Sequence, residues 1–273
     1  MRRLINQLPG KGGALALGVL PFFLLFIVYV LASDARLADN ANDKLLPALN
    51  TIADSIHTYA LEEDKRSGTV LLWTDTWASL KRLGLGLGIG AALGLFFGIA
   101  VGVVPYVRAT LQPFIAVLSL IPPLAVLPIL FVVFGLDELS KVVLIVFGVA
   151  PIIMRDLALR VAELPREQII KAQTLGASTW QIVVRVVLPQ MWPRLIDAVR
   201  LTLGSAWLFL IAAEAIAATE GLGYRIFLVR RYMAMDVILP YVAWITLLAF
   251  AMDYALRVLS RRLYPWMQRS DTA

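Results

Sequence analysis

Six long apolar runs, separated by short polar stretches, constrain the fold of this chain more than any other feature. They cover residues 14–32, 83–104, 111–134, 142–154, 195–219 and 238–259. A helix needs about 20 apolar residues to cross a bilayer, so the pattern predicts six transmembrane helices, of which the fourth is short and could extend past Lys141. Only 16% of the residues are charged, which excludes an ordinary soluble domain. We therefore expect an all-α polytopic membrane protein.

The distribution of Lys and Arg predicts the orientation of these helices. With the N-terminus inside, 15 of the 25 basic residues face the cytoplasm. This places the N-terminal segment 1–13, the loop 155–194 and the tail 263–273 in the cytoplasm. The first run, 14–32, is longer than the apolar core of a secretory signal peptide, so we expect a retained helix, with a cleaved signal as the alternative.

The polar segment 33–76 then lies outside the membrane. It contains one predicted amphipathic helix at 47–60, because Leu49, Ile52 and Ile56 recur on one helical face.

Several classes of function lack the residues that they require. The chain has no Cys and a single His, His57, and no cluster of acids or His at membrane depth that an integral membrane enzyme would need. No selectivity loop of a channel is evident. The net charge of +6 is explained by basic loops held against anionic lipid, so we expect no nucleic-acid partner. No Walker A loop is present, and the segment 10–12 lacks its spacing.

Five glycines recur at four-residue spacing in the second apolar run. They are Gly86, Gly90, Gly94, Gly98 and Gly102. At this spacing they share one helix face, and the absence of side chains lets a neighbouring helix approach closely. We predict that this face meets protein rather than lipid, either as static packing or as a contact across which two helices slide.

Prolines interrupt the third apolar run at Pro122, Pro123 and Pro128. The adjacent pair removes two backbone donors and disfavours helix just before it, so a broken helix is expected. Broken backbone at membrane depth is tolerated where it lines a cavity or is covered by other helices. The region 118–130 is therefore a candidate lining of a translocation pathway, and a simple kink in the bundle is the alternative.

Glu214 is the one acidic residue well inside an apolar run. Carboxylates in membranes are costly and usually face the protein interior or a water path. Glu214 is therefore a pathway candidate that would contact substrate, line a gate, or hydrogen-bond a neighbouring helix.

The segment 165–189 predicts an ordered pair of helices within the cytoplasmic loop, where a short polar link would suffice. The first helix is expected over 166–175, behind a proline suited to a helix start. Gly176 can end this helix in the left-handed conformation.

The second helix of this pair begins at Ser178, because Gln181 follows three residues later as a capping box. We expect it to run to Leu188 and to stop there, since Pro189 disfavours continuation. Such a pair would present a basic, amphipathic surface to an external motor. A helix that lies on lipid is the alternative.

This loop resembles the cytoplasmic loop of permeases of ATP-binding-cassette (ABC) importers, whose pattern is Glu-Ala-Ala, three residues, Gly, nine residues, Ile, any residue, Leu-Pro. The positions that match at the full spacing are Ala172, Gly176, Leu188 and Pro189. The positions that differ are Ile170, Lys171 and Val186. The missing Glu removes one polar contact that the family makes with its ATPase, without changing the docking mode.

Four further segments are similar to the nitrate, sulfonate and taurine permease subfamily. They are PPLAVLP at 122–128, FGLDELSK at 134–141, TLGASTW at 174–180 and GLGY at 221–224. Together the similarity covers roughly residues 75–262. The outer segment, with DKLLPALNTIADSI at 43–56, also looks like permeases found beside urea-amide catabolic genes.

The resemblance implies the type I ABC importer permease fold, with the permease domain at 77–262, in the plasma (inner) membrane of a bacterium. Two permease subunits, here expected to be two copies of this chain, would form the pathway. Two ATPases would dock on the cytoplasmic helices and bind the ATP and Mg²⁺, and a soluble binding protein would deliver the solute. The chain itself would bind no cofactor or metal and would catalyse no reaction.

The resemblance also implies the substrate class and the coupling residues. The solute would be a small anion such as nitrate, a sulfonate or taurine, with a urea-, amide- or guanidine-type compound as the alternative. The residues that would carry coupling to the ATPase are Arg166, Lys171, Ala172, Gly176, Ser178, Trp180, Leu188 and Pro189.

Overall fold

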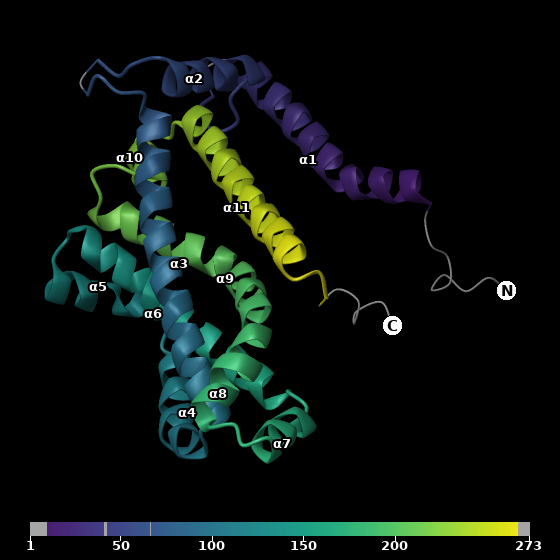
Figure 1. Cartoon of the computed structure of the whole chain (residues 1–273). Coiled ribbons are helices and arrows are strands. Elements are labelled where there is room, and N and C mark those ends of the chain that lie inside the picture. The colour runs from purple at the N-terminus through teal and green to yellow at the C-terminus, as the bar shows by residue number, and fades with distance from the viewer. Residues whose placement is uncertain (1–9, 41–42, 66, 267–273) are drawn as a thin grey trace.

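The computed structural model describes residues 10–40, 43–65 and 67–266, and within these ranges the protein is built of helices without a strand (Figure 1). The helices are α1 (Lys11–Asp39), α2 (Leu49–Leu61), α3 (Leu71–Val103), α4 (Pro105–Leu120), α5 (Pro123–Phe134), α6 (Glu138–Ala162), α7 (Arg166–Thr174), α8 (Thr179–Ile182), a π-helical segment (Val183–Val187), α9 (Leu188–Ala217), α10 (Leu222–Arg230) and α11 (Met235–Leu263). The predicted all-α class is confirmed. Of the predicted cytoplasmic termini, residues 1–9 and 267–273 lie outside the described residues.

Five helical runs in the described chain are long and apolar enough to cross a membrane. They are α1, α3, α6, the run from α8 to α9, and α11. The pair α4 and α5 is a sixth candidate if it is taken as one broken span. The number of spans thus agrees with the six apolar runs.

The third span is not one straight helix. The axes of α4 and α5 are bent by 96°, with Pro122 at the N-cap of α5 and Pro123 as its first residue. The predicted break at the proline pair is confirmed, and the predicted span over 111–134 is replaced by two helices of 16 and 12 residues.

The fourth span is longer than its apolar run. α6 begins at Glu138, and its first turn contains Lys141, which is only 3% exposed. The Lys141 Nζ atom donates to Glu138 Oε1 at 2.9 Å. Lys141 can lie within the helix because its charge is paired with Glu138. α6 therefore begins before the apolar run that starts at residue 142.

The five predicted glycines pack α3 along α6, and all five are buried. The residues that face them on α6 also recur every four positions: Ile145, Val149, Ile153, Leu157 and Val161. A Cβ atom added at Gly94 would lie 2.4 Å from Ile153 Cγ2, and one added at Gly98 would lie 2.8 Å from Leu157 Cβ. The glycine face therefore meets protein, as its spacing predicts, and α3 and α6 form the centre of the fold.

The first two helices lie outside this centre. Figure 1 shows α1 projecting away from the bundle and α2 lying across the end of α11. The hydroxyl of Tyr29 in α1 donates to the carbonyl oxygen of Pro47 at 2.7 Å, and the hydroxyl of Ser55 in α2 donates to Asp236 at 2.6 Å. The predicted amphipathic helix at 47–60 is confirmed as α2.

Candidate functional site

The first helix of the predicted cytoplasmic loop, α7, ends in a hydrogen-bonded glycine turn. Gly176 has a φ of +80°, in the left-handed region. Its N–H donates to the carbonyl of Gln173 at 2.9 Å, and the N–H of Ala177 donates to the carbonyl of Ala172 at 3.0 Å. These two bonds satisfy carbonyls at the helix end, as in a Schellman motif. The prediction that Gly176 ends this helix in the left-handed conformation is confirmed.

The second helix starts at Ser178 with the predicted capping box. The backbone N–H of Ser178 donates to Gln181 Oε1 at 2.8 Å, and the N–H of Gln181 donates to Ser178 Oγ at 3.3 Å. Both ends of the short link between the helices are therefore fixed by hydrogen bonds rather than by packing alone.

The predicted end of this helix before Pro189 is wrong. The chain continues from α8 through the π-helical segment directly into α9. In the wider π turn, the N–H of Leu188 donates to the carbonyl of Val183, five residues back. Pro189 follows directly as the second residue of α9, so the wider π turn lies where the ring and missing N–H of a proline would disturb a regular α-helical turn. Leu188 and Pro189 thus join two helices instead of ending one.

The helix pair is braced against the membrane helices on one side. Ile182 is buried in the core, and Ala172 and Ala177 pack against the same core. The side-chain amide of Gln190 in α9 donates to Gln168 Oε1 in α7 at 3.0 Å. The spacing from Gln168 to Gln190 has no helical periodicity, so sequence reasoning missed this brace.

Three large apolar side chains of the helix pair are exposed. Ile170, Leu175 and Trp180 are 56%, 80% and 74% exposed, and we call these three residues the docking face. Arg166 and Lys171 are also exposed. Large apolar side chains held at the tip of a braced helix pair are typical of a protein-binding surface. Trp180 was predicted here, whereas Ile170 and Leu175 were not, since apolar residues in such a segment normally suggest burial.

At the far end of α9, Glu214 is fully buried among donors from other helices. Its Oε1 atom accepts from Arg82 Nη1 at 2.7 Å and from the hydroxyl of Ser79 at 2.8 Å, and its Oε2 atom accepts from the N–H of Gly223 at 2.9 Å. Arg82 also donates to Glu138 at 2.8 Å. Of the three expected roles, this geometry corresponds to hydrogen bonding with neighbouring helices.

A second buried carboxylate, Asp75, continues this network toward α10 and α11. It accepts from Arg225 Nε at 2.8 Å, from the N–H of Gly221 at 2.9 Å and from the hydroxyl of Tyr241 at 3.2 Å. Sequence reasoning missed Asp75 because it assigned the residue to the outer loop, whereas α3 begins at Leu71. We call Asp75, Ser79, Arg82 and Glu214 the outer polar network. Their partners are contributed by α6, α10 and α11.

The predicted pathway prolines lie on the bent pair. Pro122 and Pro128 are exposed in the single chain, and Pro123 is half-buried. α5 also exposes Ile129 and Val132, at 60% and 87%. The lining of a pathway by this pair stays a prediction.

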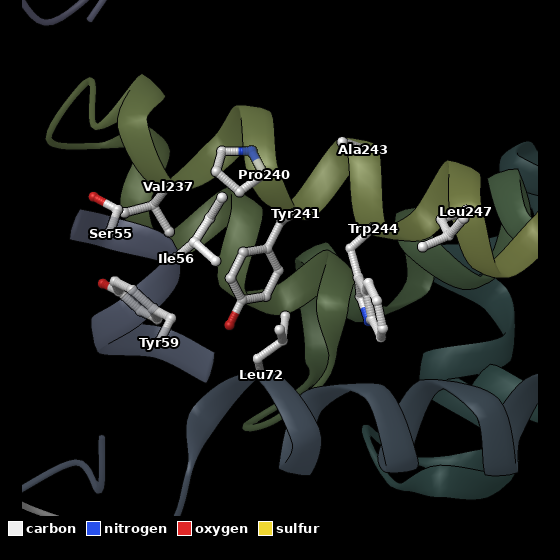
Figure 2. A pocket seen from close by; sticks show the side chains of 10 residues that line it. All are labelled: Ser55, Ile56, Tyr59, Leu72, Val237, Pro240, Tyr241, Ala243, Trp244 and Leu247. Atoms are coloured by element: carbon white, nitrogen blue, oxygen red, sulfur yellow. The ribbon is translucent and has the colours of Figure 1, made fainter. Parts of the chain in front are cut away.

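A cavity of about 230 Å³ lies between α2, α3 and the outer end of α11 (Figure 2). Figure 2 shows Ile56 and Tyr59 of α2 facing Tyr241 and Trp244 of α11 across it, with Leu72 of α3 below. No charged side chain lines it. A polar solute would find no partner for its charge here, so this cavity is not a candidate substrate site.

Residues 86–268 match a family model described as the binding-protein-dependent transport system inner membrane component. Among curated proteins, the chain is similar to the taurine transport system permease protein TauC of Escherichia coli (strain K12). The two are 39% identical over 222 residues, which cover 81% of this chain and 80% of that protein.

Two solved structures show the same fold. A chain of the inward-facing MetNI methionine ABC transporter has a TM-score of 0.64 at 23% identity, covering 73% of this chain and 99% of that chain. A chain of a bacterial alginate ABC transporter, solved in complex with an alginate pentasaccharide-bound periplasmic protein, has a TM-score of 0.61 at 14% identity and covers 91% and 98%. The predicted type I importer permease fold is confirmed.

Proposed function

We propose that the docking face of this chain couples a translocation pathway to a separate ATPase. The chain belongs to the binding-protein-dependent transport system inner membrane components and is the permease subunit of an ABC importer. Like its relatives, it is a multi-pass inner membrane protein and a transport subunit, not an enzyme.

The observation that carries the coupling proposal is the continuity of helix from the docking face to the outer polar network. The run from α8 to α9 is a single helical stretch of 39 residues, Thr179–Ala217. Trp180 lies at its start and Glu214 near its end. A displacement of Trp180 by a moving partner would therefore be passed along one helical run, which the π-helical segment, Pro189 and Pro193 interrupt without ending.

The exposed residues of the docking face indicate which surface the partner ATPase must offer. An ATPase that fits this face offers an apolar groove for Leu175 and Trp180, with acidic residues beside it for Arg166 and Lys171. That ATPase would bind the ATP and Mg²⁺. A soluble binding protein would deliver the solute at the outer face, and a second copy of this chain would complete the pathway.

Replacing Leu175 tests the coupling role. We expect Leu175→Asp to weaken co-purification of the ATPase by about tenfold or more, because a charge would enter the apolar groove. Leu61→Asp is the matched control, since Leu61 is a similarly exposed leucine, at 69%, on the opposite side of the protein. Equal capture of ATPase by the two variants would refute the proposal.

For the substrate, we propose a small anion of the sulfonate class, such as taurine. The support is the 39% identity to a taurine permease together with the subfamily segments at 122–128, 134–141 and 174–180. Uptake of labelled taurine by cells that express the complete importer, competed with unlabelled sulfonate, nitrate or urea, tests it. Competition by urea but not by sulfonate would instead favour the urea- or amide-type solute that the outer segment 43–56 suggests.

A further inference from the structure

A second polar site lies at the inner ends of α3, α4 and α6, where the structure forms an open cavity of about 260 Å³. Three polar side chains line it, Arg108, Gln112 and Arg155, and the other walls are apolar, with Ile115 and Leu159 among them. Figure 1 places α4 at the same end of the molecule as α7 and α8, which the orientation assigns to the cytoplasm. The cavity is therefore basic at its rim, apolar in its walls, and close to the inner membrane surface.

Arg108 is held in place by the end of α3. Its Nε atom donates to the carbonyl of Val101 at 3.1 Å, and its Nη2 atom donates to the carbonyl of Gly102. These bonds satisfy carbonyls that the helix end leaves free. They leave the Nη1 atom of Arg108 without a protein acceptor among the described residues, so it remains available for a ligand.

Arg155 has no acidic partner in the described part of the chain. The neighbouring acids on α6 pair elsewhere: Asp156 lies 3.6 Å from Arg160 Nε, and Glu163 lies 3.2 Å from Arg160 Nη1. Arg155 is exposed, as is Gln112, whose amide has no partner within the described residues either. Two cations and an amide thus line one cavity without an anion among them.

We propose that this cavity binds the headgroup of an anionic phospholipid of the cytoplasmic leaflet. The phosphate would accept from Arg108 and Arg155, the amide of Gln112 would bond a second oxygen, and the start of an acyl chain would lie along Ile115 and Leu159. Basic cavities between membrane helices at the cytoplasmic surface suit such headgroups, because both charge and apolar surface are satisfied together. A free oxyanion would use the arginines but gain nothing from the apolar walls.

A titration of the purified full-length chain in detergent tests this proposal. The probes are a short-chain phosphatidylglycerol, a phosphatidylcholine with the same chains, and glycerol phosphate. We expect phosphatidylglycerol to bind more tightly than either of the others. Tighter or equal binding of glycerol phosphate would overturn the proposal in favour of a free-anion site, and equal binding of the two lipids would overturn it in favour of unspecific apolar contact.

Variants locate the site on the chain. We expect Arg155→Gln to lower the preference for phosphatidylglycerol by about fivefold, the effect of one basic residue at a membrane surface, and Arg155→Lys to retain it. Arg185→Gln is the control, because Arg185 is also exposed and predicted to be cytoplasmic, and removes the same charge. Since Arg155 makes no contact that folding requires, the variant should elute and melt like wild type. Equal losses in Arg155→Gln and Arg185→Gln would refute the assignment.

Discussion

Substituting alanine for Gly94 tests the packing of α3 on α6 at its tightest point. The new Cβ would lie 2.4 Å from Ile153 Cγ2 and 2.8 Å from Ile153 Cβ, whereas carbon atoms rest about 3.5–4 Å apart. Ile153 is fully buried and branched at Cβ, so no rotamer change moves both atoms away. The helices must separate by about 1 Å, and overpacking of this kind costs about 1–3 kcal/mol.

Gly90→Ala provides a control within the same glycine face. There the added Cβ would lie 3.5 Å from Val149 Cγ1, an ordinary contact distance. Both substitutions raise helix propensity by the same amount, about 1 kcal/mol, so the difference between the two variants isolates the overpacking. We expect the apparent Tm of Gly94→Ala in detergent to fall below that of Gly90→Ala by at least about 2 °C.

A double-mutant cycle identifies the contact responsible. In an Ile153→Ala background the Cγ2 atom is gone, so Gly94→Ala should cost less than it does in the wild type. Equal melting of the Gly94→Ala and Gly90→Ala variants, or an unchanged cost in the Ile153→Ala background, would show that the two helices are not packed as described.

The remaining predictions concern the outer polar network and the helix pair. Glu214→Ala should destabilise the chain by about 3 kcal/mol because buried Arg82 loses a carboxylate, and a thermal melt that matches wild type would contradict this. Gly176→Ala should cost about 1–2 kcal/mol through backbone strain alone, since the site is open, and faster hydrogen exchange at the turn would report it. Ser178→Ala should cost about 1 kcal/mol and speed exchange of the Gln181 amide, which an intact exchange rate would argue against.

Local features of this protein could be predicted from its sequence, because neighbouring residues determine them. The turn at Gly176, the capping box at Ser178 and the break at Pro122 each depend on residues within five positions of one another. The glycine face also followed from spacing alone. The stop at Pro189 could not be predicted correctly, because a π turn depends on how the surrounding helices pack and has no simple residue pattern.

The partners of buried charges could not be predicted, because they lie far apart in the chain. Glu214 meets Arg82 across 132 residues, and Asp75 meets Arg225 across 150. The sequence marked Glu214 as unusual for a membrane helix without indicating whether a solute or another helix would pair with it. The docking face was likewise only partly predicted, since the exposure of Ile170 and Leu175 depends on how α7 packs against the membrane helices and not on local pattern.

The α3–α6 contact allows the two helices to pack only at fixed positions along their axes. Each branched side chain of α6 rests in a notch left by a glycine, and the next notch lies four residues, about 6 Å, further along the axis. A smaller shift would push a branched side chain of α6 onto residues of α3 that carry side chains. Gradual sliding of the two helices past each other is therefore blocked. The helices α3 and α6 therefore move as one rigid unit. The shape change of a transport cycle would then occur at other joints, for which the 96° bend between α4 and α5 is a candidate.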